Sequence, residues 1–128
     1  MIGGDTKAIL QVSTTTKNEI GEQVKAWVDV PVMMPERKEP GLFGWLDYRS
    51  GEANYATYNA KIQESSHVFI CDYVQIPATI VVNGKNVSIN VENARMMIDS
   101  KQYDVKLMDD PMGLHQHLEF FLDYTGGQ

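Results

Sequence analysis

The sequence has a single cysteine, no long apolar run and no excess of positive charge, and each of these scarcities narrows the class of protein. One cysteine, Cys71, excludes an internal disulfide. It lies in the apolar run HVFICDY, where a buried and unreactive thiol is expected. The apolar residues come in runs far below the roughly 18 residues that a membrane-spanning helix needs. We therefore expect no association with a membrane.

The first ten residues, MIGGDTKAIL, lack the basic stretch followed by an apolar stretch that marks a secretory signal, so synthesis in a cytoplasm is expected. The net charge is −6 and the isoelectric point is near 4.9. Proteins that read DNA sequence carry a basic stripe that neutralises phosphates, and none is present here. An acidic surface suits a protein past which DNA slides without being held.

Motifs for phosphate binding and hydrolysis are also absent, including the P-loop, GxGxxG, GxSxG and HExxH. His115 and His117 would share one face of a strand, but a third ligand is near only in sequence, so they are weak metal candidates. The paired carboxylates of MDDPMG could serve acid–base chemistry or bind calcium. Asp-Pro followed by Gly is more simply a turn. We predict no enzyme activity, no cofactor and no metal.

Strand patterns fill most of the chain. β-Branched and alternating apolar residues indicate strands in these segments: 8–17, 22–34, 58–73, 80–90, ARMMID, KQYDVKLMDD and 116–124. Asn18 and Gly21 supply the turn of a first hairpin, and Asn83-Gly84 is the preferred pair for a tight type I′ turn. A short polar turn near Asp99 to Lys101 joins two further strands. Pro31 limits the second strand to an edge or a bulge at its end.

These short strands predict a mainly β fold, a small antiparallel β-barrel with at most one short helix. Residues 1–128 form one domain, with flexible ends at 1–7 and 125–128. Residues 39–57 combine large aromatics with glycines and show no strand or helix period, which predicts a long mobile loop between early strands. The residues of this loop that we expect to gate a channel or contact a subunit are Leu42, Phe43, Gly44, Trp45, Leu46, Tyr48 and Arg49.

Three further side chains are candidates for partner contact. Trp27 lies on the strand face opposite Val24 and Val28, so it either contacts a partner or twists into the core, and we favour the core. Met33 and Met34 fill core gaps or serve an adaptable interface. The loop aromatics have a plainer interpretation as well, in which they fold back over an open end of the barrel as a lid.

Four segments, taken in order, resemble the head–tail joining (head-closure, or stopper) proteins of tailed phages. TTTKNEIGEQVKAWVDV matches the family's first hairpin, with its polar turn and a tryptophan at Trp27. KIQESSHVFICDY resembles the middle strand, RMMIDSKQYDVKLMDD the next hairpin, and HLEFFLDY the closing strand. The chain departs from the family in carrying Cys71 and Asp72 where an arginine is common, in a longer TIVVNGKNVSIN hairpin and in an extended aromatic loop.

The resemblance implies a virion protein of the phage neck, made in the host bacterial cytoplasm. Such a protein forms a ring with copies of itself below the portal-adaptor (connector) protein. It closes the channel through which genomic DNA passes and provides the surface for tail attachment. Its partners would be the adaptor and a tail-completion or tail tube protein.

Two other functions stay open on the sequence alone. A tail-completion or tail-terminator protein is also β-rich and ring-forming, but it binds the tail tube first. A small β-barrel ligand-binding module would need a polar pocket and specific ligands that the sequence does not display.

Overall fold

The computed structural model describes residues 3–35, 37–48 and 66–127 of the 128-residue chain, and it is mainly β. Its strands are β1 (Thr6–Lys17), β2 (Gln23–Asp29), β3 (Leu42–Tyr48), β4 (His67–Asp72), β5 (Thr79–Val82), β6 (Lys85–Ser88), β7 (Ala94–Ile98), β8 (Lys101–Asp109) and β9 (His117–Gly127). Two single turns of 3-10 helix, η2 (Val91–Asn93) and η3 (Pro111–Gly113), are the helical segments of this part of the chain. The predicted fold class is confirmed.

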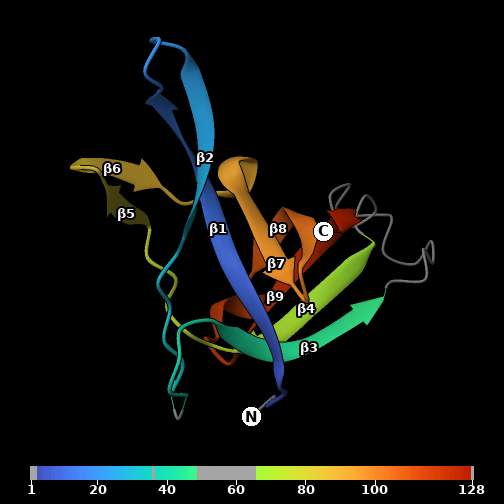
Figure 1. The fold of residues 1–128 in the computed structure, drawn as a ribbon. Coiled ribbons are helices and arrows are strands. Elements are labelled where there is room, and N and C mark those ends of the chain that lie inside the picture. Colours follow the sequence, from blue (N-terminus) through green and yellow to red (C-terminus); the bar gives the residue numbers. More distant parts are fainter. Residues whose placement is uncertain (1–2, 36, 49–65, 128) are drawn as a thin grey trace.

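Six of the described strands close into an antiparallel barrel in the order β1-β3-β4-β9-β8-β7, because β7 pairs back to β1 (Figure 1). The pairing β1–β7 runs from Ala8↔Ile98 to Val12↔Ala94. Because the barrel is closed, the backbone edges of its wall strands are all paired along these registers. The inward side chains form one apolar core, whose fully buried members include Leu10, Leu42, Phe69, Cys71, Met96, Ile98, Phe120 and Leu122.

Strand β1 is longer than the barrel wall and continues beyond it as one half of a hairpin. Gln11 pairs with Asp29 of β2 on one edge and with Arg95 of β7 on the other. Pairing with β7 stops at Val12, whereas pairing with β2 continues to Lys17↔Gln23. We call residues 13–25 the arm; it projects away from the barrel in Figure 1.

The segment 42–48 is a barrel strand, so the predicted mobile loop is wrong for these residues. Strand β3 pairs with β1 through Thr6↔Gly44 and with β4 from Gly44↔Cys71 to Tyr48↔His67. A Cβ at position 44 would overlap the carbonyl oxygen of Ile70 and lie 2.9 Å from the Cβ of Cys71. Glycine is therefore required where two backbones approach closely, rather than for flexibility. The rest of the expected loop, 49–57, lies outside the described residues.

The connection between β2 and β3 covers the outer face of β3 and hides its strand period. Phe43 is 7% exposed, its N–H donates to the sulfur of Met34 at 3.1 Å, and the Arg37 guanidinium lies 4.3 Å from its ring centre. Leu42, on the opposite face, is 1% exposed. With both faces buried at its first two residues, β3 lacks there the apolar–polar alternation of a half-exposed strand.

The turns follow their sequence signals. Asn83 and Gly84 both have positive φ, 51° and 78°, as a type I′ turn requires. Asp99 and Ser100 repeat the arrangement between β7 and β8, with φ of 52° and 64°. Strand β2 ends at Asp29, two residues before Pro31. The predicted hairpins are confirmed.

Both predicted flexible ends are shorter than expected. At the start, β1 already includes residues 6 and 7, and the Gly4 carbonyl accepts a 2.7 Å hydrogen bond from Arg37. At the end, β9 extends through Gly126 and Gly127, which pair with Gln102 and Lys101. Strand β8 begins early enough to offer these glycines a partner, so the composition of the tail does not decide its structure.

Candidate interaction surfaces

A clamped tryptophan lies where the arm leaves the barrel. The Arg95 guanidinium lies 4.1 Å from the Trp27 ring centre, and the Lys25 ammonium lies 5.0 Å from it. Arg95 is held by two amides, because its Nε donates to Gln11 at 2.7 Å and its Nη1 donates to Gln102 at 2.9 Å. Trp27 is half-buried and is not part of the core, so the expectation of a core tryptophan is wrong. A fixed aromatic ring with cations beside it is typical of protein-contact surfaces.

The tip of the arm is a defined turn that presents an apolar side chain. The Asn18 side-chain oxygen accepts the N–H groups of Ile20 at 3.1 Å and Glu22 at 2.9 Å. Gly21 follows with a φ of 84°. Ile20 is held outward at 78% exposure by this turn. The arm therefore ends in a rigid projection with a single apolar contact point.

A second projection is formed by β5 and β6. These strands pair with each other as a two-stranded sheet, separate from the barrel strands. Val81 on its outer face is 70% exposed, whereas Ile80 and Val87 on the inner face pack toward the core. The hairpin is anchored behind β6, where the Asn93 side chain donates to the Ser88 carbonyl at 2.7 Å and caps η2 together with Asn90.

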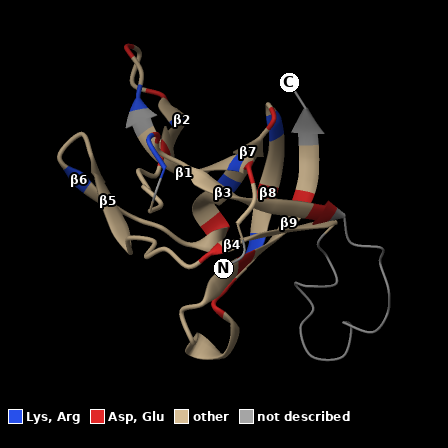
Figure 2. Ribbon diagram, turned by 90° about the horizontal axis from the view of Figure 1, so that it is seen from below, with Lys and Arg blue, Asp and Glu red and all other residues tan. Residues whose placement is uncertain are grey.

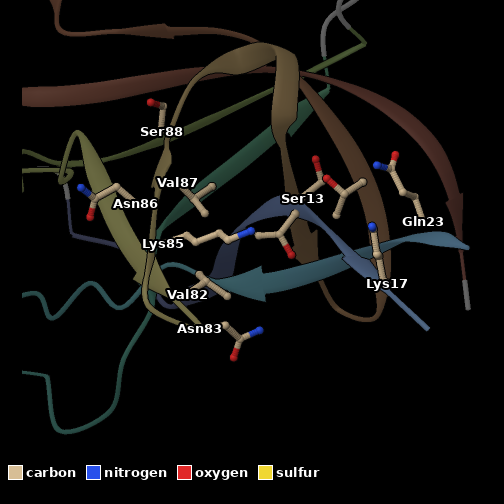
Figure 3. Close-up of a pocket in the computed structure, with 11 residues that line it drawn as sticks. Ser13, Lys17, Gln23, Val82, Asn83, Lys85, Asn86, Val87 and Ser88 are labelled. Atoms are coloured by element: carbon tan, nitrogen blue, oxygen red, sulfur yellow. The ribbon is translucent and has the colours of Figure 1, made fainter. Parts of the chain in front are cut away.

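The two projections enclose a groove of about 750 Å³ (Figure 3). One wall comes from the arm and the other from the β5–β6 hairpin. The lining residues are mostly hydroxyl and amide side chains with two valines and two lysines: Ser13, Thr14, Thr15, Lys17, Gln23, Val82, Asn83, Lys85, Asn86, Val87 and Ser88. No aspartate or glutamate is among them. Such groups can hold a polar chain by hydrogen bonds and attract negative charge, but they do not form an acid–base pair.

The charged residues elsewhere on the described part of the molecule are mixed in sign. Figure 2 shows lysines, arginines and acids interspersed along the barrel strands, whereas the β5–β6 hairpin carries only a basic position. The groove is therefore locally basic, although the net charge of the whole chain is −6.

A hollow of about 550 Å³ lies at the barrel end near the N-terminus. Its lining includes Arg37, Phe43, Tyr73 and His115. Arg37 is already held by Asp5 at 3.2 Å, and the His115 ring packs 4.5 Å from Tyr73. The strongest polar groups of this hollow are therefore engaged within the chain.

The two histidines named as weak metal candidates are held by separate carboxylates. His115 pairs with Asp110, and His117 lies 3.0 Å from Glu119. In the ranges that the structure describes, no group of three or more histidines, cysteines and acids is placed to hold a metal ion.

The predicted gating residues separate into buried and exposed sets. Leu42, Phe43 and Gly44 are buried in the barrel wall, Leu46 is half-buried, and Trp45 is 55% exposed. These positions form one strand, so they do not provide a movable element.

The other residues predicted for gating or partner contact lie in different parts of the chain. Tyr48 ends β3, and Arg49 lies outside the described residues. Of the methionines, Met34 is buried against Phe43, whereas Met33 is 52% exposed and stays available for partner contact.

Burial in the barrel shifts the pKa of Cys71 and of His67, among other side chains. Burial, with a smaller effect of Asp72, raises the pKa of Cys71 to about 12, so the thiol stays protonated and unreactive. The expectation for Cys71 is confirmed. Burial lowers the pKa of His67, which lies edge-on to Tyr103 with ring centres 5.2 Å apart.

The sequence alone does not indicate the groove, because its two walls lie far apart in the chain, at residues 13–23 and 82–88. One signal was present. The run STTTK after Val12 lacks the apolar alternation of a wall strand, which indicates that β1 leaves the core there.

No protein-family model and no curated protein matches the sequence. Among the described residues, no helix is long and apolar enough to cross a membrane.

Proposed function

We propose that the protein is a structural subunit of the tailed-phage neck. In this role it forms a ring below the portal-adaptor protein, closes the DNA channel and offers a surface for tail attachment. The supporting observation is where the exposed apolar side chains lie. Ile20 is on the arm tip, Val81 on the β5–β6 hairpin and Met112 on the β8–β9 connection, each at least 70% exposed. Apolar groups on protrusions gain stability by burial against partners, as assembly subunits require.

The order of the family-like segments also supports the proposal. The first segment contains the tip of the arm and β2, and the described part of the second contains β4. The third spans β7 and β8 from Arg95 onward, and the last lies within β9. The resembling segments therefore follow the order of the strands along the chain. The β5–β6 hairpin and the segment that contains β3 are the places where the chain departs in length from the family pattern.

The structure changes which element we propose for partner contact. Strand β3 is part of the barrel wall, and moving it would open the barrel. The arm and the β5–β6 hairpin lie outside the wall and can contact neighbours without disturbing the core. We therefore assign ring and tail contacts to these two projections, together with Trp27 at the base of the arm.

A nonsense mutation in the gene, made in the phage that encodes this chain, tests the proposal. A neck subunit that closes the head predicts filled heads that lose their DNA, together with free tails of normal length. Complementation with the wild-type gene should restore DNA retention. Tails of abnormal length with stable filled heads would contradict the proposal and indicate a tail-terminator instead.

A further inference from the structure

The arm has one backbone edge that no described strand covers. Successive residues of a strand direct their N–H and C=O groups to opposite edges. The Leu10 carbonyl accepts the Val30 N–H, and the Asn18 N–H donates to the Glu22 carbonyl, so even-numbered residues of β1 face β2. The backbone groups of Ser13, Thr15 and Lys17 therefore face the opposite edge. Pairing with β7 on that edge ends at Val12.

This edge borders the groove, because Ser13, Thr15 and Lys17 all line it. Figure 3 shows Lys85 reaching from β6 toward Ser13 across the space. An edge of five residues, 13–17, is about 16 Å long at the rise of a β-strand. The groove volume of about 750 Å³ is large enough for several residues of extended chain.

The charge of the groove selects what can enter. Lys17 and Lys85 line it, and acidic residues do not. Because the net charge of the chain is −6, this is a locally basic site on an acidic protein. Val82 and Val87 add apolar contact on the hairpin side. The matching occupant is an extended segment with alternating acidic and apolar side chains.

We propose that this groove is a slot for an acidic, extended segment of a partner polypeptide, which adds a strand to the free edge of β1. Its main chain would bond to Ser13, Thr15 and Lys17, its carboxylates would face the two lysines, and the β5–β6 hairpin would cover it. Strand addition of this kind obtains affinity from main-chain hydrogen bonds and specificity from side chains. The slot does not depend on the role in the neck, because it follows from the edge, the groove and the charge alone.

Amide hydrogen exchange of the full chain, with and without a probe peptide, tests the proposal directly. The probe is a peptide of about nine residues in which glutamate alternates with valine, since this length spans the edge with a margin. We expect slower exchange at Ser13, Thr15 and Lys17, at least tenfold at saturation, and little change at Thr14, which already faces β2. The same peptide with alternate amides N-methylated should not protect these amides.

Two variants separate strand addition from simple charge attraction. Thr15→Pro removes a slot-facing N–H on an edge position where proline is tolerated, so the arm should stay folded while peptide affinity falls at least tenfold. Lys85→Glu should lower affinity by a similar factor, whereas Lys38→Glu, an exposed lysine outside the groove, should leave it within twofold.

Three results would overturn the proposal. One is equal binding of the N-methylated and unmodified peptides. Another is wild-type affinity in Thr15→Pro when its far-ultraviolet circular dichroism is unchanged. The last is self-association of the protein that protects Ser13 and Thr15 while the peptide does not bind, because the slot would then hold a second copy.

Discussion

At the scale of single residues, Gly44 decides whether β3 can lie against β4. Its position leaves no room for a side chain, since a Cβ would overlap the Ile70 carbonyl and press on Cys71. Cys71 is itself fully buried, so it has little space in which to move. The sequence suggests flexibility at Gly44, but the structure requires a glycine there because two strands pack closely.

Gly44→Ala should therefore destabilise the barrel. We expect a loss of about 1–3 kcal/mol in the free energy of unfolding, from forced displacement of β4, measured by urea denaturation. The matched control is Gly84→Asn, at a turn position with φ of 78° and no atom within 4 Å of a new Cβ. Because asparagine tolerates positive φ, the control should lose less than about 1 kcal/mol. Equal losses in both variants would contradict the packing argument.

His67 gives the barrel a dependence on pH. Burial lowers its pKa in the folded protein below the ordinary value of 6.5. The unfolded chain therefore binds a proton more readily, so the contribution of His67 is full above about pH 6.5 and is lost as the pH falls toward the folded pKa. We expect the Tm to drop between about pH 7.5 and 5.5, and to drop less in His67→Gln.

A second non-titrating variant, His67→Asn, provides the control for this prediction. It should reduce the pH dependence of the Tm as His67→Gln does, because both remove the imidazole. A His67→Gln profile that matches wild type would show that this side chain is not the source of the dependence.

At the scale of elements, the arm and the barrel are built on the same strand but depend on different contacts. The wall part of β1 contributes Ala8, Leu10 and Val12 to the core, each at most 2% exposed. Beyond Val12 the arm contributes no member of the core among the described residues. Its stability comes from pairing with β2 and from the Trp27–Arg95 contact at its base.

Shortening the arm should therefore leave the barrel folded. Removing residues 17–23 and joining Thr16 to Val24 through Asn-Gly keeps their pairing and closes it with a type I′ turn. We expect the Tm to change by only a few degrees, since little apolar area is lost. In the complementation assay this variant should fail to restore DNA retention. Full restoration would show that the arm makes no essential contact.

The elements that the sequence predicted are those whose signals are local. Asn83-Gly84 specifies its own turn, and the buried Leu118, Phe120 and Leu122 alternate with half-buried residues along β9. Strand β3 could not be predicted in this way. Leu42 and Phe43 are buried on opposite faces, and Gly44, which follows them, gives no side chain to continue a pattern. The layer that buries Phe43 comes from Met34 and Arg37, which the sequence places in an irregular connection.

The candidate surfaces were only partly predictable for the same reason. Trp27 could be singled out from its place opposite an apolar face, but its neighbour Arg95 is 68 residues away and is brought to it by the β1–β7 pairing. The groove likewise depends on how far β1 extends past the end of β7. Barrel closure sets that distance, and no local pattern encodes it.

At the scale of the whole molecule, a closed barrel carries two projections that lie outside its wall. The barrel buries one continuous apolar cluster, whereas the arm tip and the β5–β6 hairpin expose Ile20 and Val81. The proposed neck ring requires both the barrel and the projections. Each subunit must stay soluble alone and must bury further surface when the ring assembles. The acidic net charge of −6 fits a conduit that does not retain DNA.

Imaging of phage heads tests the neck assignment most directly. Purified protein would be mixed with DNA-filled, tailless heads, and the particles examined by cryo-electron microscopy. A role in the neck predicts a new ring below the portal, built of barrels whose arms contact neighbouring subunits. Heads without added density, with the protein instead bound at the ends of isolated tail tubes, would contradict it.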